Sequence, residues 1–353
     1  MVNWTSTMQQ TFEYYIVDPG TWTDIKRIDT VINSTISRDL EAETLGSASI
    51  TITESLGECY VRIYLVTIQN GIREKHPLGT YLVQTPSYSF DGRIKNITMD
   101  AYTPLLELKE KYPPIGYFIH KDENILERVC QILREQLRAP LVAGTKDTKL
   151  STNFIANPDE TWMRFVTDLL ANAEMRLELD ELGRVLFSPE QSLASLQPIW
   201  TFDTDNSSIL YPNFDLNHDL YGIPNVVEVV YSNGSTTTST LAENKNQNSP
   251  VSIQSRGRKI VHRITNPDVI GRPSQKELEE YAAKILKELS SIEYTISFKH
   301  GYCPVRIGDC VRLNYERAGI RNVKAKIVSQ SIECTPGCPV SSKAIFTTNL
   351  WED

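Results

Sequence analysis

The residue types that most often perform catalysis form no familiar pattern in this sequence. A zinc protease helix needs two histidines one turn apart, so that both rings face one metal. The five histidines lie far apart, and none precedes a glutamate: they are His76, His120, His218, His262 and His300. Phosphate-binding loops of the Walker or GxGxxG form are missing. Gly46–Ile50 begins like a GxSxG nucleophile turn but lacks its second glycine. We expect no catalytic residue and no cofactor.

Two groups of residues could bind a metal ion, and neither has the expected spacing. Asp203 and Asp205 begin like a calcium loop, but Ser208 stands where that loop needs glycine, and Phe214 stands where it needs glutamate. Four of the six cysteines could supply thiolates to zinc, without the paired C-x2-C of zinc ribbons: Cys303, Cys310, Cys334 and Cys338. We expect no metal site, and thiols that pack as small apolar side chains in a reducing compartment.

Charged residues gather at two places. One is a predicted helix face on which acids and lysines balance each other at helical spacings: Lys276, Glu277, Glu279, Glu280, Lys284 and Lys287. The other is a basic cluster from Arg256 to Arg263, which lacks the interleaved aromatic side chains that stack on bases. A solvated loop or a protein interface is the favoured interpretation of this cluster, and contact with a nucleic acid backbone stays open.

Composition indicates a folded protein of two or three domains. At roughly 150 residues per domain, 353 residues are enough for real cores. The net charge of −8 is uneven, because residues 251–353 hold 16 basic and 11 acidic residues. Binding to phosphates needs a large basic surface, so sequence-specific DNA binding is not favoured. No apolar segment approaches the ~20 residues that span a bilayer, so we expect synthesis in the cytosol without membrane insertion.

The elements that must position these residues fall into three ranges. Residues 1–112 predict an antiparallel β domain, with Glu58–Gln69 dense in β-branched and aromatic residues. Asp91-Gly92 separates two strand-like segments, and this pair favours a hairpin turn because both of its central residues need positive φ.

Residues 113–198 predict a small α/β insertion. The apolar period changes here to that of helices, and two stripes each cover one helix face: Leu126, Val129, Cys130, Leu133 and Leu137, then Trp162, Phe165, Val166, Leu169, Leu170 and Ala173. Two short strands, Met175–Leu179 and Val185–Ser188, are predicted on either side of the Glu181–Gly183 turn.

Residues 199–353 predict a second β domain with a long helix near 274–290. Ser274–Glu277 is a capping box, and an apolar stripe follows it as far as Leu289. The polar segment 232–249 holds almost nothing to bury and is predicted to be a mobile loop or an exposed hairpin.

The two β ranges share an order of short motifs. The first contains Val61-Arg62-Ile63, Gly71-Ile72-Arg73 and Asp91-Gly92, and the second contains Val311-Arg312-Leu313, Gly319-Ile320-Arg321 and Pro336-Gly337. A different register pairs Gly57–Ile63 with Gly301–Ile307. Because strand composition alone could produce part of either match, the sequence leaves both a duplicated β domain and chance similarity open.

The order of the elements resembles that of phage tail baseplate hub proteins, the XkdQ and late-control-D group, which are related to the amino-terminal part of type VI secretion spike proteins. The segments that carry the resemblance span nearly the whole chain: Thr103–Leu106, Glu174–Leu177, Gly183–Phe187, Ser255–Ile260 and Ile307–Leu313 with Gly319. The resemblance implies a mainly β fold with an α+β insertion, in which two tail-tube-like antiparallel barrel or sandwich domains each have an accompanying helix.

The resemblance also implies a function. As a homotrimer, such a protein would present six tube-like domains, so that threefold symmetry could match a sixfold tube. It would cap the distal end of the tail tube, contact the tube or distal tail protein, and hold a central spike or tail-tip protein. The tape measure protein is a further candidate partner, and DNA would pass through without sequence recognition. The expected location is the virion tail baseplate, after synthesis in the host bacterial cytoplasm.

Two other classes of function stay open. One is a cell-wall or carbohydrate hydrolase of the tail tip, with carboxylates gathered in residues 113–198. The other is a receptor or carbohydrate-binding module, which the 16 tyrosines and five tryptophans would permit. The sequence does not distinguish contractile tails, flexible tails and bacteriocin-like particles.

Overall fold

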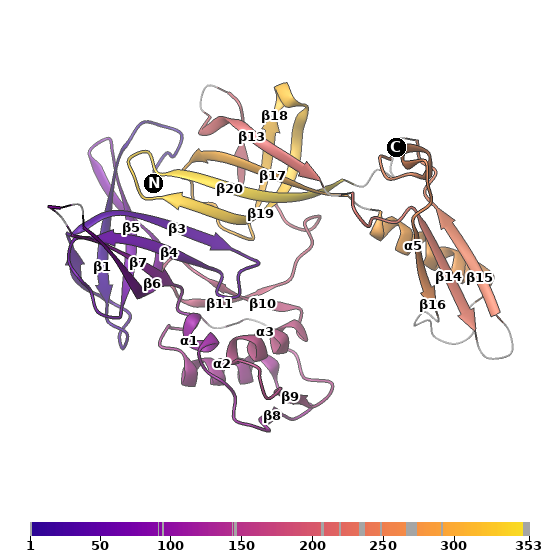
Figure 1. Cartoon of the computed structure of the whole chain (residues 1–353), viewed down its shortest axis with the longest axis horizontal. Helices are drawn as coiled ribbons and strands as arrows, with labels where there is room; N and C mark the ends of the chain where they lie inside the picture. Colours follow the sequence, from indigo (N-terminus) through magenta and orange to yellow (C-terminus); the bar gives the residue numbers. More distant parts are fainter. Residues whose placement is uncertain are drawn as a thin grey trace. The chain divides into compact units, whose positions relative to one another are not determined.

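The computed structural model of the chain describes residues 2–90, 92–93, 95–142, 144, 147–205, 208–218, 220–232, 237–247, 249–265, 274–290 and 292–348. The chain forms two compact units. Unit 1 comprises Met1–Phe214 and Ser297–Ala344, and unit 2 comprises Asp215–Ile296 and Ile345–Asp353. The fold is mainly β, as the sequence predicts (Figure 1).

The amino-terminal strands, which we call module 1, lie side by side in the order β3-β4-β7-β6-β5-β1-β2, and each neighbouring pair is antiparallel. Their bounds are β1 (Gln9–Val17), β2 (Asp24–Ile28), β3 (Val31–Asp39), β4 (Gly46–Ile52), β5 (Cys59–Gln69), β6 (Ile72–Phe90) and β7 (Lys95–Tyr102). The predicted hairpin joins β6 to β7 around Gly92, whose φ of +95° suits glycine. Its neighbour Asp91 lies outside the described residues.

The carboxyl-terminal strands, which we call module 2, lie in the order β13-β17-β20-β19-β18-β12. Their bounds are β12 (Trp200–Phe202), β13 (Leu210–His218), β17 (Ile292–Gly301), β18 (Cys310–Tyr315), β19 (Ile320–Glu333) and β20 (Pro339–Thr348). A short 3-10 turn, Glu316–Ala318, precedes β19.

The two modules have the same strand order along the chain and across the sheet. Module 1 without β2 reads β3-β4-β7-β6-β5-β1, and module 2 reads β13-β17-β20-β19-β18-β12. The motif Val61–Ile63 lies in β5 and Val311–Leu313 in β18, and a glycine of similar φ follows each: Gly71 (+76°) and Gly319 (+78°). Val305–Ile307, on which the other register depends, lies between strands. The structure therefore selects the first register.

The modules join edge to edge in one sheet. Strand β3 pairs antiparallel with the carboxyl-terminal part of β19, from Thr35 opposite Glu333 to Asp39 opposite Ser329. In the centre of this pairing Ile36 lies opposite Ile332, and the two side chains are 0% and 1% exposed. Both belong to a core that also holds Ile50, Ile97 and Met99 of module 1. This burial makes unit 1 one body.

The insertion between the modules has a helical layer. It contains α1 (Leu106–Lys109), β8 (Phe118–Ile119), α2 (Ile125–Gln136), β9 (Phe154–Ile155), α3 (Trp162–Ala171), β10 (Met175–Leu179) and β11 (Val185–Pro189). Helix α3 begins at the cap Thr161, whose Oγ1 accepts from the Arg164 amide. The two predicted apolar stripes share one core with Trp22, Tyr60 and Leu82 of module 1. The three-domain division at residues 112 and 198 remains a prediction.

Unit 2 is a three-stranded sheet with one helix packed on it. The sheet has the order β15-β14-β16, formed by β14 (Val226–Ser232), β15 (Thr237–Glu243) and β16 (Val261–Thr265); the helices are α4 (Ile253–Arg256) and α5 (Gln275–Leu289). The predicted capping box is present, because Ser274 and Glu277 bond each other's backbone amides. Leu278, Ala282 and Leu286 of α5 pack on Val227 and Val229.

The segment 232–249, predicted as a mobile loop or an exposed hairpin, contains a strand. Strand β15 pairs antiparallel with β14 over its whole length and places the buried Thr240 beside Val229. Residues 233–236 and 248 lie outside the described residues. Of the two predicted structures, the hairpin is therefore the one that residues 237–243 adopt. Alternate small side chains of this strand pack against α5. Among the described residues, no helix is long and apolar enough to cross a membrane.

Candidate functional site

Several polar contacts of unit 1 converge on the turn between β10 and β11, residues 180–184, which we call the clasp turn. It contacts module 1 through Leu182 and module 2 through Glu181. Asp180 shapes the turn by accepting from the amides of Leu182 (3.0 Å) and Arg184 (2.8 Å). The turn thus bridges the two modules.

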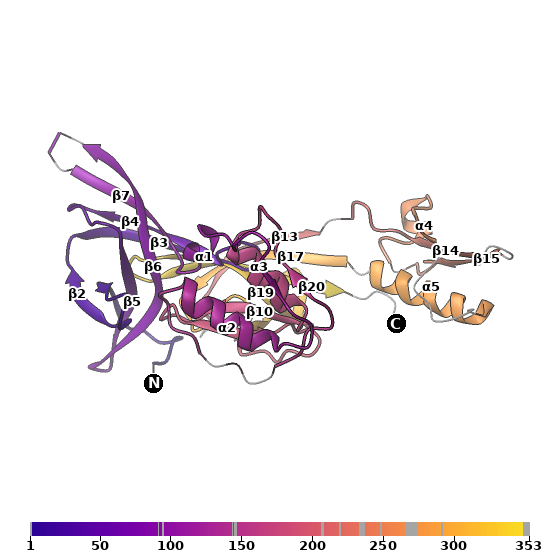
Figure 2. The same cartoon turned by 90° about the horizontal axis from the view of Figure 1, so that it is seen from below.

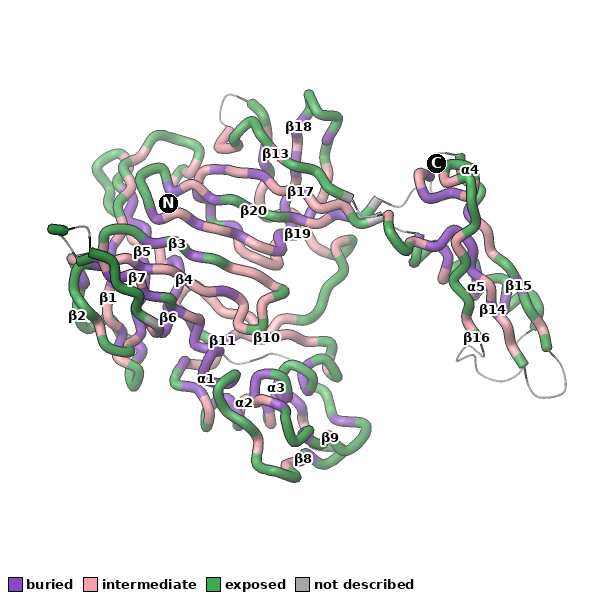
Figure 3. Tube along the Cα trace, viewed as in Figure 1, coloured by how far each residue is buried: buried purple, intermediate pink, exposed green. Residues whose placement is uncertain are grey.

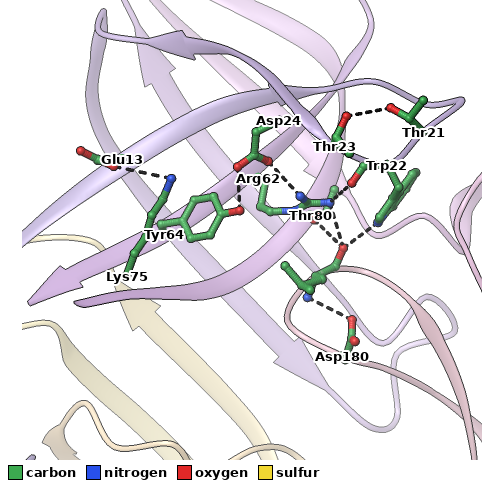
Figure 4. A network of polar contacts seen from close by, with 11 residues as sticks. Glu13, Thr21, Trp22, Thr23, Asp24, Arg62, Tyr64, Lys75, Thr80 and Asp180 are labelled. Carbon is green, nitrogen blue, oxygen red and sulfur yellow. Dashed lines mark hydrogen bonds and ion pairs between the residues drawn. The ribbon is translucent and has the colours of Figure 1, made fainter. Parts of the chain in front are cut away.

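The contact with module 1 converges on one backbone oxygen. The Leu182 carbonyl accepts from Trp22 Nε1 at 2.7 Å, from Thr80 Oγ1 at 2.9 Å and from Arg62 Nη2 at 3.3 Å (Figure 4). Gly183 has a φ of +75°, and a Cβ there would stand 2.8 Å from Thr80 Cβ. Only glycine fits this close approach without strain.

Arg62 is the centre of this contact and is 4% exposed. Its guanidinium pairs with Asp24 Oδ1 at 2.8 Å and donates to Thr80 Oγ1 at 2.8 Å and to the Trp22 carbonyl at 3.1 Å (Figure 4). Tyr64 donates to the second oxygen of Asp24 at 2.7 Å, and burial raises the pKa of Tyr64 to about 12. A buried guanidinium whose three nitrogens all donate hydrogen bonds holds one geometry, because any displacement would leave a buried charge without its partners.

The contact with module 2 is made by Arg306. Its Nε lies 2.7 Å from Glu181 Oε1, and its Nη2 donates to the Leu179 carbonyl at 2.5 Å. The Arg306 amide donates to Asp309 at 2.7 Å, and burial raises the pKa of Asp309. The segment Ile307–Leu313, singled out from the sequence, therefore begins with the turn that follows Arg306 and continues into β18.

A cavity of about 270 Å³ lies beside the clasp turn, within unit 1. Its charged lining comes from both modules and the insertion, with four cations and four acids: Arg38, Arg176, Arg306 and Lys326, and Glu178, Asp180, Glu181 and Asp309. Arg176 pairs with Glu178 at 2.6 Å, and Arg38 donates to the Leu78 carbonyl at 2.7 Å. Cations and acids balance, so the cavity has no clear preference for an ion of either sign.

A second polar link ties module 1 to the insertion. Glu107 is 6% exposed and accepts from Tyr60 OH and from Arg138 Nε, each at 2.5 Å, while its other oxygen accepts from the Arg138 amide at 3.0 Å. Glu107 follows the Thr103–Leu106 segment, whose Leu105 and Leu106 enter the shared core. The segment therefore anchors the insertion.

The residues considered as metal ligands do not form a ligand set in the described part of the chain. Cys303, Cys334 and Cys338 are buried; burial raises the pKa of Cys303 to about 12 and of Cys334 to about 11, so these thiols are protonated near neutral pH. Asp203 accepts from Asn314 of β18. Within the described part of the chain, no three His, Cys, Asp or Glu residues come together to hold a metal ion.

His300 and His76 both pack against aromatic side chains. His300 is buried beside Phe202 and Phe298, donates from Nδ1 to the Gly301 carbonyl at 2.7 Å, and lies 2.9 Å from Ser342 Oγ. Burial lowers the pKa of His300 to about 4. His76 contacts the Trp4 ring.

The basic cluster is engaged inside unit 2. Arg256 donates to the carbonyls of Leu220 and Ile223, Lys259 pairs with Glu243 at 2.5 Å, and Arg263 pairs with Glu228 at 2.6 Å. These partners favour the structural interpretation of the cluster over contact with nucleic acid. On the charged face of α5, Lys276 pairs with Glu280 at 3.8 Å and Lys284 with Glu288 at 3.9 Å.

Sequence reasoning missed the residues that join the parts of unit 1, above all Arg62, Glu107 and the Leu182 carbonyl. Two signals were present. Arg62 was part of the repeated motif, and Gly183 was part of a predicted turn. Neither signal identifies a partner 120 residues away, because a backbone carbonyl acceptor has no sequence signature.

The comparisons with known proteins rest on structure. No protein-family model and no curated protein matches the sequence. The tail protein from Neisseria meningitidis MC58 aligns with a TM-score of 0.64 at 11% identity, over 96% of each chain. The 43 kDa tail protein of prophage MuSo2 from Shewanella oneidensis aligns with a TM-score of 0.62 at 12% identity, over 95% of this chain and 98% of that chain.

A third solved structure lies outside phage tails. A chain of the Francisella PdpA–VgrG complex aligns with a TM-score of 0.56 at 8% identity, over 97% of this chain and 53% of that chain. The resemblance expected from the sequence is therefore confirmed in fold, and this chain has, over nearly its whole length, the fold of phage tail proteins.

Proposed function

We propose that the protein is a structural hub of a phage or phage-like tail, non-enzymatic and homotrimeric, that caps the distal end of the tail tube. Support comes from the shared fold with two tail proteins and with a chain of the PdpA–VgrG complex. In this role it contacts the tube or distal tail protein on one side and a central spike or tail-tip protein on the other, with the tape measure protein as a further candidate partner.

The single observation that carries the proposal is the repeated strand order of modules 1 and 2. A closed ring needs the same surface at equal angles. A trimer of a chain with two equivalent modules presents six such surfaces, so it can match a sixfold tube. A chain with one module could match that tube only as a hexamer, and it would then not match a threefold spike.

The clasp turn gives the proposal a mechanical basis. Six surfaces are equally spaced only if the angle between the two modules of each chain is fixed. Pairing of β3 with β19, the Arg62 contacts and the Arg306–Glu181 pair all hold that angle. These contacts resist a change in the angle between the modules. Breaking any of the buried ones would leave a charge or a donor without a partner.

Several acids of the insertion have structural partners, which favours a structural role over hydrolysis. Asp147 accepts from the amides of Leu126 and Glu127 at the start of α2, Glu160 accepts from the Asn157 amide, and Glu178 pairs with Arg176. Passage of DNA without sequence recognition suits a chain whose net charge is −8.

The test is the mass of the purified protein by light scattering and native mass spectrometry, followed by an image down the symmetry axis. We expect a mass near three times 40.1 kDa and a ring with six similar lobes. A protein that stays monomeric at all concentrations and binds neither tube nor spike proteins would contradict the proposal. Release of sugars or peptides from purified peptidoglycan, abolished by one Asp or Glu substitution, would support the hydrolase instead.

A further inference from the structure

The cavity of about 270 Å³ beside the clasp turn is large enough to hold a small organic molecule. A cavity of about 150 Å³ can hold benzene, so this one has room for a molecule nearly twice that size. Module 1, module 2 and the insertion all contribute to its wall, among others through Leu78, Lys326 and Leu179. One lining residue, Gln191, is exposed, so a molecule can reach the cavity from solvent.

Most charges in the wall already have a partner within the protein. Three ion pairs account for them: Arg176 with Glu178, Arg306 with Glu181, and Asp180 with Arg184. The lining residues that remain are Lys326, Asp309 and Arg38, and Arg38 donates to the Leu78 carbonyl but has no acid partner among the described residues. These three decide what the cavity can bind, because a paired charge gains little from a further partner.

Lys326 is a half-buried cation without a partner. Along β19 it lies between the buried Ala325 and Ile327, so its side chain leaves the opposite face of the sheet (Figure 3 shows the burial of each strand). Strand β10, which supplies Arg176 to the cavity, lies close to β19 in the turned view (Figure 2). Burial, together with the charge of Arg176, lowers the pKa of Lys326, and no described carboxylate pairs with its Nζ. A carboxylate bound here would remove that cost.

Asp309 is an acid in the opposite situation. Among the described residues its carboxylate accepts from the Arg306 amide, at 2.7 Å, but pairs with no cationic side chain. Burial raises the pKa of Asp309. It lies near Lys326 along the fold, because the Ile327 amide donates to the Asp309 carbonyl at 2.9 Å, yet the two side chains form no ion pair with each other. The cavity thus separates one unpaired acid from one unpaired base.

Apolar side chains form much of the remaining wall: Leu40, Leu45, Leu78, Leu179, Leu196 and Ile307. They come from both modules and from the insertion. An aliphatic group bound among them would leave water, which favours binding in proportion to the apolar area that is buried. A bare inorganic ion would gain nothing from this part of the wall.

We propose that the cavity binds a small zwitterion, an aliphatic amino acid or dipeptide, with its carboxylate at Lys326 and its ammonium group at Asp309. Arg38 and Lys326 against Asp309 leave one positive charge over, so a ligand with an ammonium group alone is disfavoured. The bound molecule contacts all three parts of unit 1 and stabilises their arrangement. The site belongs to the single chain and does not depend on the proposed trimer.

Calorimetry and thermal unfolding of the full chain with the dipeptide alanyl-leucine test the site. We expect one dipeptide per chain and a Tm higher by about 3 °C or more when the dipeptide is in large excess over its Kd. N-acetyl-alanyl-leucine lacks the ammonium group and alanyl-leucinamide lacks the carboxylate, so each should bind about tenfold more weakly. Free leucine, with leucinamide and N-acetyl-leucine beside it, distinguishes an amino acid from a dipeptide as the ligand, and the same selectivity in either series supports the proposal.

Two substitutions assign the two ends of the ligand. Lys326→Met keeps the apolar stem, and it should bind alanyl-leucine and alanyl-leucinamide equally while still rejecting the acetylated dipeptide. Asp309→Asn keeps the size, and it should lose the preference for the free ammonium group alone. Lys343→Met, at an exposed residue of β20, is the matched control and should bind as wild type does. If Asp309→Asn fails to fold, Lys326→Met decides, because Lys326 has no described bond to lose.

The results that would overturn the proposal are distinct. Binding of none of these compounds at millimolar concentration would show that the cavity takes no zwitterion. Equal stabilisation by the free, acetylated and amidated forms would show that only the apolar wall binds. Selectivity that survives Lys326→Met would place the carboxylate elsewhere.

Discussion

Modules 1 and 2 share a strand order. They differ in one connection between strands, in strand length and in the pairing of one outer strand. Between β3 and β4, module 1 has a short turn at residues 40–45, whereas module 2 carries most of unit 2 between β13 and β17. Strand β6 has 19 residues and β19 has 14. Strand β1 pairs antiparallel with β5 over nine residues, whereas β12 pairs parallel with β18 over three.

The comparison shows which parts of the module tolerate change. A hairpin turn tolerates an inserted unit because the two strand ends stay close together, so the insert need only match that distance. The central strands β5, β6 and β7 and their counterparts keep the same order because each contacts strands on both sides.

The largest effect is expected where the modules join. Ile332→Asp would bury an unpaired carboxylate opposite Ile36, and we expect a loss of about 4 kcal/mol or more in the free energy of unfolding. Ile32→Asp, on the same β3 strand but 52% exposed, is the control and should change that free energy by less than about 0.5 kcal/mol. Urea unfolding measures both, and equal effects would show that the junction is not closely packed.

The repeated arginine allows the modules to be compared at one motif position. Arg62→Ala removes the cation of a buried ion pair and leaves Asp24 without a positive partner, so a loss of about 3–5 kcal/mol is expected. Arg312, the motif counterpart, has a buried Nε with no hydrogen-bond partner in the described structure, so Arg312→Ala should cost about 1 kcal/mol. Similar losses for the two variants, in thermal or urea unfolding, would contradict the assigned role of Arg62.

Acid is expected to act on module 2 through His300. Its folded-state pKa of about 4 lies below the unfolded value near 6.5, so between these values the unfolded chain binds the extra proton. Stability is therefore fully present above pH 6.5 and falls by roughly 3 kcal/mol as the pH drops to about 4. Urea unfolding of wild type and His300→Gln from pH 7 to 4.5 measures this, and the variant should lack that part of the slope. The exposed His120→Gln is the control, and a parallel slope for wild type and His300→Gln would refute the assignment.

The smallest effect separates unit 2 from unit 1. Ser274→Ala removes the cap of α5 and should lower the stability of unit 2 by about 1 kcal/mol. Hydrogen exchange measured on both units should show faster opening in α5 and unchanged opening in β5 and β6. Ser239→Ala, at an exposed residue of β15, is the control. Equal acceleration in both units would mean that they unfold together.

Much of the local structure followed from the sequence. The helical stripes predicted α2, α3 and α5, because helix formation and the burial of one face depend on residues three and four apart. The repeated Val-Arg-hydrophobic motif with its following glycine lies in the equivalent strands β5 and β18, but the sequence also permitted a second register, which the structure excludes. The resemblance drawn from the order of elements is confirmed in fold.

The contacts across the junctions could not be predicted in the same way. The Leu182 carbonyl, Glu107 and the pairing of β3 with β19 join residues far apart in sequence. The small polar side chains of segment 232–249 favour a loop and an exposed hairpin equally, and packing against α5 selects the strand at 237–243.

The amino-acid sequence alone determined the kinds of element, the sites of the glycine turns and the repetition of a strand motif, because these depend on backbone sterics and on hydrophobic period over a few residues. Only the tertiary structure decided which strand edges are paired and which are open. Backbone hydrogen bonds are alike for every residue except proline, so the choice of partner is made by the shape and burial of whole surfaces.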